Sequence, residues 1–278
     1  MNGTILWGQP EILFYVLPPC EDARCGIGYP DYVETPTEIY ITETDKALSR
    51  WHLVPSKMLS AMWQQLTLSE VAQTALVTNV TGSSGLPPQM PAPSFGNLQE
   101  NYAFTVEVVF TPDRLYRRNV TRPVPLLDCR APNGKGVAIE YTQPAASPIG
   151  GPGCTRQYKV NVSICDGNHS QSFDTDTEAQ LWSAGPHHIV FVVDGASRTI
   201  TSVVNGVFAD GGYERSQGWA HLGTDDLTRG DHPQLIGDVG GAASCSVHSS
   251  LTLARIYDRG LLTSEAIGNW RAWKAGGA

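Results

Sequence analysis

Two apolar runs, each followed by a turn dipeptide, stand in the last third of the chain: His187-His188-Ile189-Val190-Phe191-Val192-Val193-Asp194-Gly195 and Thr199-Ile200-Thr201-Ser202-Val203-Val204-Asn205-Gly206-Val207-Phe208. Asp-Gly and Asn-Gly between strand-like runs favour tight hairpins, because both central residues of a type I′ turn need a positive φ. A meander whose hairpins return about every ten residues builds a β-sandwich. The stretch therefore predicts an all-β, antiparallel fold.

Alternation of apolar and polar residues extends this pattern in both directions. One predicted strand alternates through Phe104, Val106, Val108 and Phe110. The remaining strand predictions in this part are 124–128, 136–142, 157–164, 233–238 and 250–257. A closing helix follows, with Thr263 or Ser264 as its N-cap and Glu265 close to its N-terminal dipole. Three of its side chains share one face and are expected to dock on the sandwich: Ala266, Trp270 and Trp273.

The same phrases resemble a known family. The run 187–195, the later Val204-Asn205-Gly206 and the string Arg255-Ile256-Tyr257-Asp258-Arg259-Gly260-Leu261-Leu262-Thr263-Ser264-Glu265 are similar to phrases of laminin-G-like, concanavalin-A-like jelly rolls. Such domains often read W-H-H-I-V-F-V-V-D-G, V-N-G and R-I-Y-D-R-x-L-L-x-x-E. The resemblance covers roughly residues 95–273. It implies an antiparallel jelly-roll β-sandwich and, for the class, carbohydrate binding.

The N-terminal part has a resemblance of its own. Trp7-Gly8-Gln9-Pro10-Glu11-Ile12-Leu13-Phe14-Tyr15, Gly28-Tyr29-Pro30-Asp31-Tyr32-Val33-Glu34 and Ile39-Tyr40-Ile41-Thr42-Glu43-Thr44 look like the last blade of a sialidase-like propeller glycoside hydrolase. Sialidases use a late tyrosine nucleophile assisted by a glutamate, for which Tyr29 and Glu43 are the nearest matches. One blade cannot supply an active site whose residues converge from several blades, so the resemblance implies that most of that site is missing.

Composition divides the chain into three parts. Residues 1–77 form the partial propeller segment, with predicted strands at 12–17 and 38–44 and an amphipathic helix at about 56–66, whose apolar stripe is expected to pack. The Gly-, Ser- and Pro-rich residues 78–94 are predicted to be a linker, because they lack apolar periodicity. Residues 95–278 form the sandwich.

Length and charge exclude several classes of partner. The 278 residues are enough for one large or two modest domains with a sizeable core. The formal net charge of −8 argues against nucleic acid, whose phosphates need clustered Lys and Arg. No apolar stretch approaches the roughly 18 residues that a bilayer-spanning helix needs, so we expect no membrane insertion.

Cysteines and sequons favour an oxidising, secretory environment. The chain has six cysteines, none in Cys-x-x-Cys spacing: Cys20, Cys25, Cys129, Cys154, Cys165 and Cys245. The Asn-x-Ser/Thr triplets begin at Asn2, Asn79, Asn119, Asn161 and Asn168. The spacing of Cys154 and Cys165 across a hairpin predicts a disulfide, and Cys20–Cys25 could close a loop. The N-terminus lacks a signal-peptide pattern, so we expect a secreted protein of which this is a C-terminal piece or a truncated product. A cytoplasmic protein with reduced cysteines is the alternative.

The residues that carry chemistry are sparse. Adjacent His187 and His188 point to opposite faces of a strand, one beside the core and the other toward solvent or a hydroxyl, so zinc is not expected. The run 174–178 (Asp-Thr-Asp-Thr-Glu) is polar and loop-like, and a solvated loop explains it better than a catalytic carboxylate pair. Laminin-G-like folds often hold Ca²⁺ on a rim, for which one local cluster offers oxygens. Its members are Asp225, Asp226, Asp231 and Asp238.

Carbohydrate binding needs an aromatic platform with amides and carboxylates nearby. Three aromatic residues in loop-like segments are the candidates: Trp182, Tyr213 and Trp219. The sequence thus predicts a glycan- or polysaccharide-binding accessory module, the C-terminal part of a secreted sialidase-like glycoside hydrolase whose propeller domain is a further partner. Two alternatives stay open: an active glycosidase or polysaccharide lyase with its site on the sandwich, and an adhesion or packing domain without a ligand.

Overall fold

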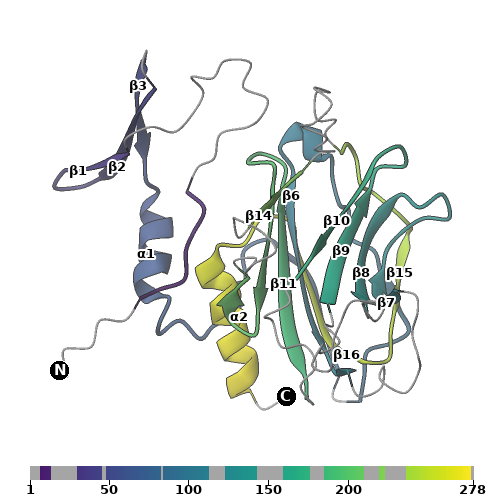
Figure 1. Ribbon diagram of the computed structural model, residues 1–278. Coiled ribbons are helices and arrows are strands. Elements are labelled where there is room, and N and C mark those ends of the chain that lie inside the picture. The colour runs from purple at the N-terminus through teal and green to yellow at the C-terminus, as the bar shows by residue number, and fades with distance from the viewer. Residues whose placement is uncertain are drawn as a thin grey trace, which may run out of the picture.

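The computed structural model describes residues 7–13, 30–45, 48–82, 84–112, 123–142, 159–175, 185–209, 219–222 and 236–276. These residues form an all-β fold of antiparallel sheets with two short helices (Figure 1). Four predicted structural elements fall wholly or partly outside the described residues: the strand 12–17 beyond residue 13, the strand 157–164 before residue 159, the strand 233–238 before residue 236, and the Cys20–Cys25 loop.

The N-terminal unit is a three-stranded sheet followed by a helix. Its sheet has the order β1-β2-β3, with the bounds β1 (Asp31–Glu34), β2 (Ile39–Asp45) and β3 (Leu48–Leu53). The helix α1 (Ser56–Gln64) matches the predicted 56–66, but in α1 itself only Met58 is buried. Trp63 is 73% exposed and Leu66 45% exposed, so the apolar stripe predicted to pack is largely uncovered.

Two larger sheets form the sandwich. One has the order β13-β12-β11-β6-β16-β4, with β14 pairing β12. Its strands are β4 (Leu76–Thr81), β6 (Ala103–Phe110), β11 (His187–Asp194), β12 (Thr199–Val204), β13 (Val207–Phe208), β14 (Trp219–His221) and β16 (Leu251–Tyr257). The other has the order β10-β9-β8-β7-β15-β5. Its strands are β5 (Gln89–Pro91), β7 (Val124–Asp128), β8 (Gly136–Thr142), β9 (Lys159–Cys165), β10 (Ser170–Asp174) and β15 (Ser244–Val247). A 3₁₀ turn, η1 (Leu98–Glu100), precedes β6.

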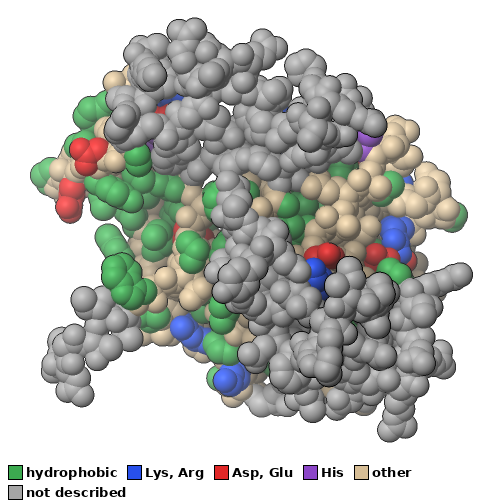
Figure 2. Space-filling model, viewed as in Figure 1, with side chains coloured by type: hydrophobic (Ala, Val, Ile, Leu, Met, Phe, Trp, Pro, Cys, Tyr) green, Lys and Arg blue, Asp and Glu red, His purple; other side chains and the backbone are tan. Residues whose placement is uncertain are grey.

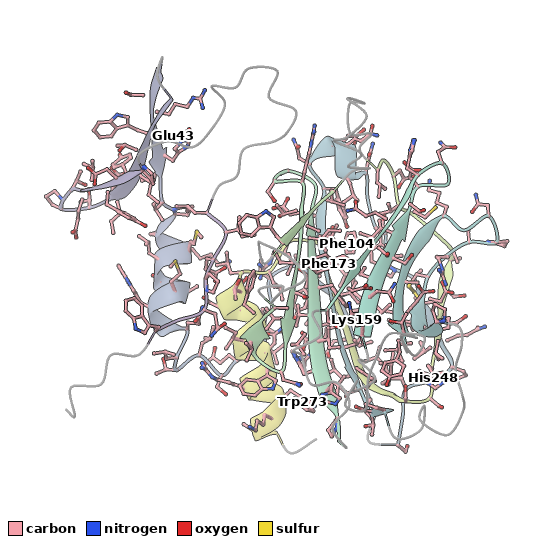
Figure 3. The ribbon with its side chains drawn as sticks, in the orientation of Figure 1. Glu43, Phe104, Lys159, Phe173, His248 and Trp273 are labelled. Carbon is pink, nitrogen blue, oxygen red and sulfur yellow. A yellow bond between two sulfur atoms is a disulfide. The ribbon has the colours of Figure 1, made fainter. Side chains whose placement is uncertain are left out.

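The main core lies between these sheets, where Phe104 and Phe173 are seen in Figure 3. A second apolar cluster joins the outer face of the seven-stranded sheet to α2 (Thr263–Ala275), through residues such as Val190, Val203 and Ile267. Ala266 is buried, Trp273 stacks on His188 at a ring-centroid distance of 5.7 Å, and the Trp270 ring covers Gly206. The predicted docking of this helix on the sandwich is therefore confirmed.

The two turn dipeptides behave differently. Asn205 and Gly206 both have a positive φ, 50° and 77°, in the predicted two-residue turn. Asp194 instead pairs with Thr199, which leaves a four-residue loop in which Arg198 takes the positive φ. The side chain of Asp194 accepts a hydrogen bond from the amide of Ala196 at 2.8 Å, which stabilises this longer loop.

The prediction that residues 78–94 only connect two domains is wrong, because this segment contributes most of β4 and all of β5. β4 pairs with β16, and β5 pairs with β15, so each strand lies at one edge of a sandwich sheet. The Gly-, Ser- and Pro-rich composition marks the turn between two edge strands, where Pro is tolerated because its missing N–H faces outward.

One disulfide joins Cys129 and Cys245, which are both buried. Cys165 is a free thiol, so the predicted Cys154–Cys165 bond is not formed, and Cys154 lies outside the described residues. Cys165 ends β9, where it pairs with Gly136 of β8 and with Ser170 of β10.

Candidate functional site

The outer face of the six-stranded sheet carries a cluster of polar side chains. Along β8, Val137, Ile139 and Tyr141 point into the core, so Ala138 and Glu140 point outward. The same alternation in β9 places Asn161 and Ser163 outward. Glu140 pairs with Asn161 across the two strands, and Ala138 pairs with Ser163, so the four residues share one face.

Arg130 joins two carboxylates on this face. Its Nε and Nη2 donate to Asp128 at 2.8 and 2.7 Å, which is a bidentate contact. Nη2 also lies 2.9 Å from Oε1 of Glu140. Asp128 ends β7, and its Oδ1 accepts from the backbone amide of Arg130 at 3.0 Å, so the turn after the strand fixes the guanidinium in place.

The contacts within this cluster shift the pKa values of Asp128 and Arg130. Burial alone would raise the pKa of Asp128, but the hydrogen bonds and charge of Arg130 hold that pKa below its usual value of 3.8. The same contacts with Asp128, together with Glu140, raise the pKa of Arg130. A glycosidase needs one carboxyl group that is protonated as general acid. This arrangement instead favours fixed charges that position a ligand.

Asn161 completes the cluster and has one unsatisfied atom. Its side-chain amide donates to Oε2 of Glu140 at 3.3 Å, while its Oδ1 is buried and has no hydrogen-bond partner. The residue is only 6% exposed. Leaving a buried acceptor unpaired costs about 1–3 kcal/mol, so the oxygen is suited to a donor that is supplied from outside the chain.

A row of small residues runs beside this polar group. Paired positions across five neighbouring strands share the outer face, and only Asp128 among them has a charged side chain: Ser246, Asp128, Ala138, Ser163 and Ser172. Asp174, the first residue of the acidic run 174–178, pairs with Asn161 on the same face, while residues 176–178 lie outside the described ranges.

The predicted aromatic platform is not brought together on this face. Trp182 and Tyr213 lie outside the described residues. Trp219 lies on β14, in the other sheet, and pairs with Thr201. Because Ile200 and Val204 of β12 face the core, Thr201 and therefore Trp219 face outward on the opposite side of the sandwich.

The predicted calcium cluster is described at one residue. Asp238 forms an ion pair with Lys135 at 2.8 Å and accepts from the amide of Gly240, and the Lys135 contact is the main reason that its pKa is lowered. Asp225, Asp226 and Asp231 are outside the described residues. In the part of the chain that the structure describes, no three His, Cys, Asp or Glu residues gather as a metal site.

The candidate sialidase glutamate lies in the N-terminal sheet. Glu43 is 4% exposed, and its Oε1 lies 2.9 Å from Nε2 of His52 and 3.2 Å from Nη1 of Arg50. Glu43 and Arg50 are directly paired across β2 and β3. Figure 3 shows Glu43 well away from Lys159 on β9 of the six-stranded sheet and from Trp273 on α2. Tyr29 is outside the described ranges.

The two adjacent histidines serve the structure. They face opposite sides as predicted, but both are buried, which corrects the expectation that one of them reaches solvent. His187 lies 5.8 Å from Phe110 (ring centroids), and His188 lies 2.9 Å from Glu107 beneath α2.

Sequence reasoning did not single out the cluster of Asp128, Arg130, Glu140 and Asn161. The polar residues that interrupt the apolar alternation of 136–142 and 159–164 were the available signal for Glu140 and Asn161. The pairing that brings Asp128 and Arg130 beside them has no signal in one sequence.

No family model and no curated protein matches this chain. Among solved structures it is similar to a sialidase of Trypanosoma rangeli, with 13% identity and a TM-score of 0.37 over 89% of this chain and 44% of that one. Domain 4 of AbnA, a GH43 extracellular arabinanase from Geobacillus stearothermophilus in complex with arabinotriose, has 13% identity and a TM-score of 0.35 over 88% of this chain and 82% of that domain. The CBM40 of a Ruminococcus gnavus sialidase, bound to α2,3 sialyllactose, has 10% identity and a TM-score of 0.35 over 64% and 96%. The chain thus spans less than half the length of the trypanosomal sialidase.

Proposed function

We propose that this chain is a carbohydrate-binding accessory module, the C-terminal part of a secreted sialidase-like glycoside hydrolase, with a laminin-G-like jelly-roll sandwich as its binding unit. The observation that carries the proposal is the outer face of the six-stranded sheet, where the buried, unpaired Oδ1 of Asn161 lies beside Arg130 and Glu140. Carbohydrate hydroxyls donate and accept hydrogen bonds, so they match fixed guanidinium, carboxylate and amide groups.

A propeller domain of the same parent protein is the proposed partner of the N-terminal unit. Tyr32, Trp51 and Trp63 are 72%, 62% and 73% exposed. The register places Tyr32 and Trp51 on opposite faces of the three-stranded sheet, so both of its faces carry uncovered aromatic area, which is typical of interaction surfaces. Figure 2 shows hydrophobic side chains gathered over this unit. Propeller blades bury such faces against their neighbours, which agrees with the sequence resemblance of this segment to a last blade.

The attachment between this unit and the sandwich is a fixed one. Oε1 and Oε2 of Glu11 accept hydrogen bonds from the amides of Ser264 and Thr263 at 2.7 and 2.8 Å. Gln65, just after α1, donates to Ser264 Oγ at 3.2 Å. The module would therefore hold a propeller in a set orientation relative to the glycan that the sandwich binds. It would raise the local concentration of that glycan at one side of the propeller.

The alternatives have weaker support. An active site on the sandwich would need a carboxyl group that is readily protonated, whereas Arg130 lowers the pKa of Asp128. A sialidase-type site that uses Tyr29 and Glu43 would need residues from further blades. A purely adhesive role without a ligand would leave the buried Oδ1 of Asn161 without a hydrogen-bond donor. Trp182, Tyr213 and Trp219 stay proposed as glycan-stacking residues, and Asp225, Asp226, Asp231 and Asp238 as a proposed Ca²⁺ site.

Secretion is proposed from the cysteines and the exposed sequons. A buried disulfide between Cys129 and Cys245 is typical of an oxidising compartment. Asn79 and Asn168 are exposed and open to glycosylation, whereas Asn161 is buried, so its sequon is unsuited to modification in the folded chain. No helix in the described part of the chain has the length and apolar character to cross a membrane.

The test is binding of the full chain to an immobilised glycan array, with Ca²⁺ and with a chelator. Binding that is lost in Asn161→Ala and kept in Asn168→Ala would support the proposal, and dependence on Ca²⁺ would support the metal site. Release of fluorophore from fluorogenic glycosides, abolished by Glu43→Gln or Glu140→Gln, would instead favour the enzymatic alternatives. Absence of any glycan binding by folded protein would contradict the proposal.

A further inference from the structure

We infer that the outer face of the six-stranded sheet takes an electrically neutral, hydroxyl-rich oligosaccharide rather than an acidic one. This inference rests on the proposed function and names its ligand class. It is carried by the charge balance around Arg130, by the unpaired acceptor of Asn161 and by the row of small residues beside them.

The guanidinium of Arg130 is already neutralised. It contacts Asp128 at 2.7 Å and Glu140 at 2.9 Å, so two carboxylates surround one cation. The carboxylate of a uronic or sialic acid would have to displace one of them and would face the other as a like charge, which disfavours its binding. The described side chains on this face include one more acid, Asp174, and one more base, Lys159.

The side chain of Asn161 has an unused hydrogen-bond acceptor. Its Oδ1 accepts no hydrogen bond from the protein, and the residue is only 6% exposed. A sugar hydroxyl donates one hydrogen bond and can accept others, so it matches this acceptor; the preference for a neutral sugar rests on the two carboxylates around Arg130. The adjacent Glu140, whose other oxygen contacts Arg130, accepts from Asn161 Nδ2 and holds the amide in this orientation.

The shape of the face suits a chain of sugars. Ser246, Ala138, Ser163 and Ser172 follow one row across five strands together with Asp128. Neighbouring strands are about 4.8 Å apart, so the row is about 19 Å long. Its side chains are short and mostly carry hydroxyls. Ser246 and Ser172 at its two ends are exposed, whereas Ala138 at its centre is 1% exposed. The length of the row matches an oligosaccharide rather than a single sugar.

The face also points away from the N-terminal unit. In Figure 1 the N-terminal sheet and α1 lie on one side, followed by α2, the seven-stranded sheet and the six-stranded sheet. A glycan on the outer face of β8 and β9 is therefore remote from the Glu43 cluster. The sugar bound here is an anchoring chain, separate from any bond that the N-terminal unit helps to cleave.

The experiment uses the full chain and paired probes of equal length, neutral gluco-, galacto-, manno- and xylo-oligosaccharides against sialylated and uronic-acid-bearing oligosaccharides. We expect a neutral probe to bind and Asn161→Ala to weaken that binding about tenfold, the loss of one hydrogen bond. Asn168→Ala, an exposed asparagine in the turn between β9 and β10, is the matched control and should bind as the unchanged chain does.

Two further variants keep the inference testable if Asn161→Ala does not fold. Ser172→Trp places a bulky group at an exposed position of the small row and should block the neutral probe without touching the cluster. Asp128→Asn combined with Glu140→Gln leaves Arg130 uncompensated and should shift preference toward acidic probes. Binding of acidic probes alone by the unchanged chain would overturn the inference and keep the proposed function, while failure of all probes would overturn both.

Discussion

Glu107 is a carboxylate with no exposed surface, and it holds the polar centre beneath α2. Its Oε1 accepts from Nη1 of Arg255 at 2.6 Å and lies 2.9 Å from Nε2 of His188. Its Oε2 accepts from Asn269 at 2.6 Å. Burial alone would raise the pKa of Glu107, but His188, Arg255 and Asn269 together bring it below the usual value of 4.5. Removing one partner of such a buried group leaves the others uncompensated.

Glu107→Gln should therefore lower the free energy of unfolding at neutral pH by about 3–5 kcal/mol. Because the folded-state pKa is depressed, the carboxylate's stabilisation is fully present above about pH 4.5 and is lost as the pH falls through that lower pKa. Urea unfolding at pH 3 and pH 7 measures both effects. The difference between the two pH values should shrink in the variant, while Glu100→Gln, an exposed carboxylate, should behave as the unchanged chain does. An unaltered pH dependence in Glu107→Gln would contradict this account.

At the scale of elements, α2 obtains its N-terminal anion from another part of the chain. The helix begins at Thr263, and its N-cap is Leu262, whose side chain makes no cap hydrogen bond, so the prediction of Thr263 or Ser264 as cap is wrong. Glu11 supplies the missing acceptor to the first amides, and Glu265 accepts from the amide of Leu262 at 3.0 Å. Both carboxylates lie at the positive end of the helix dipole.

Glu11→Gln should lower the free energy of unfolding by about 0.5–2 kcal/mol, because the amides lose a charged acceptor at the helix N-terminus. Thermal melting followed by circular dichroism measures the loss, which should be smaller at high salt, where the dipole interaction is screened. Glu34→Gln, at an exposed position of β1, is the matched control. Equal melting temperatures for Glu11→Gln and the control would show that the helix does not depend on this contact.

The sequence predicts well those elements that form through local interactions, and poorly those that depend on contacts between distant segments. The strands 124–128, 136–142 and 199–204 were predicted at the bounds observed, since alternation and hairpin residues are local signals. The Glu11 cap, the Arg130 cluster and the edge strand β4 depend on contacts between segments distant in sequence. Composition alone therefore predicted a linker where β4 pairs with β16.

At the scale of the molecule, one covalent link ties the six-stranded sheet together. Cys129 and Cys245, 116 residues apart, join the segment after β7 to β15. Closing a loop of this length restricts the unfolded chain, so Cys129→Ala with Cys245→Ala should lose about 2–5 kcal/mol of stability. Guanidinium unfolding measures the loss, with Cys165→Ala, at the free thiol, as the control. Peptide mapping without reductant should recover the linked pair, and a Cys154–Cys165 peptide in its place would contradict the structure.

The sandwich also depends on residues before position 95. β4 covers one edge of the seven-stranded sheet through β16, β5 covers an edge of the other through β15, and the Ala72 amide donates to Asn269 of α2 at 2.8 Å. A chain that begins at residue 95 would expose both edges and leave an acceptor of α2 unpaired, so it should melt at a lower temperature and associate through its open edges. A chain that begins at residue 66 keeps all three contacts and is the matched comparison. Melting and light scattering of the two chains decide the point. Equal stability and monomeric behaviour would mean that β4 and β5 only lie on the sandwich, whereas the expected difference makes them part of the folding unit of the sandwich.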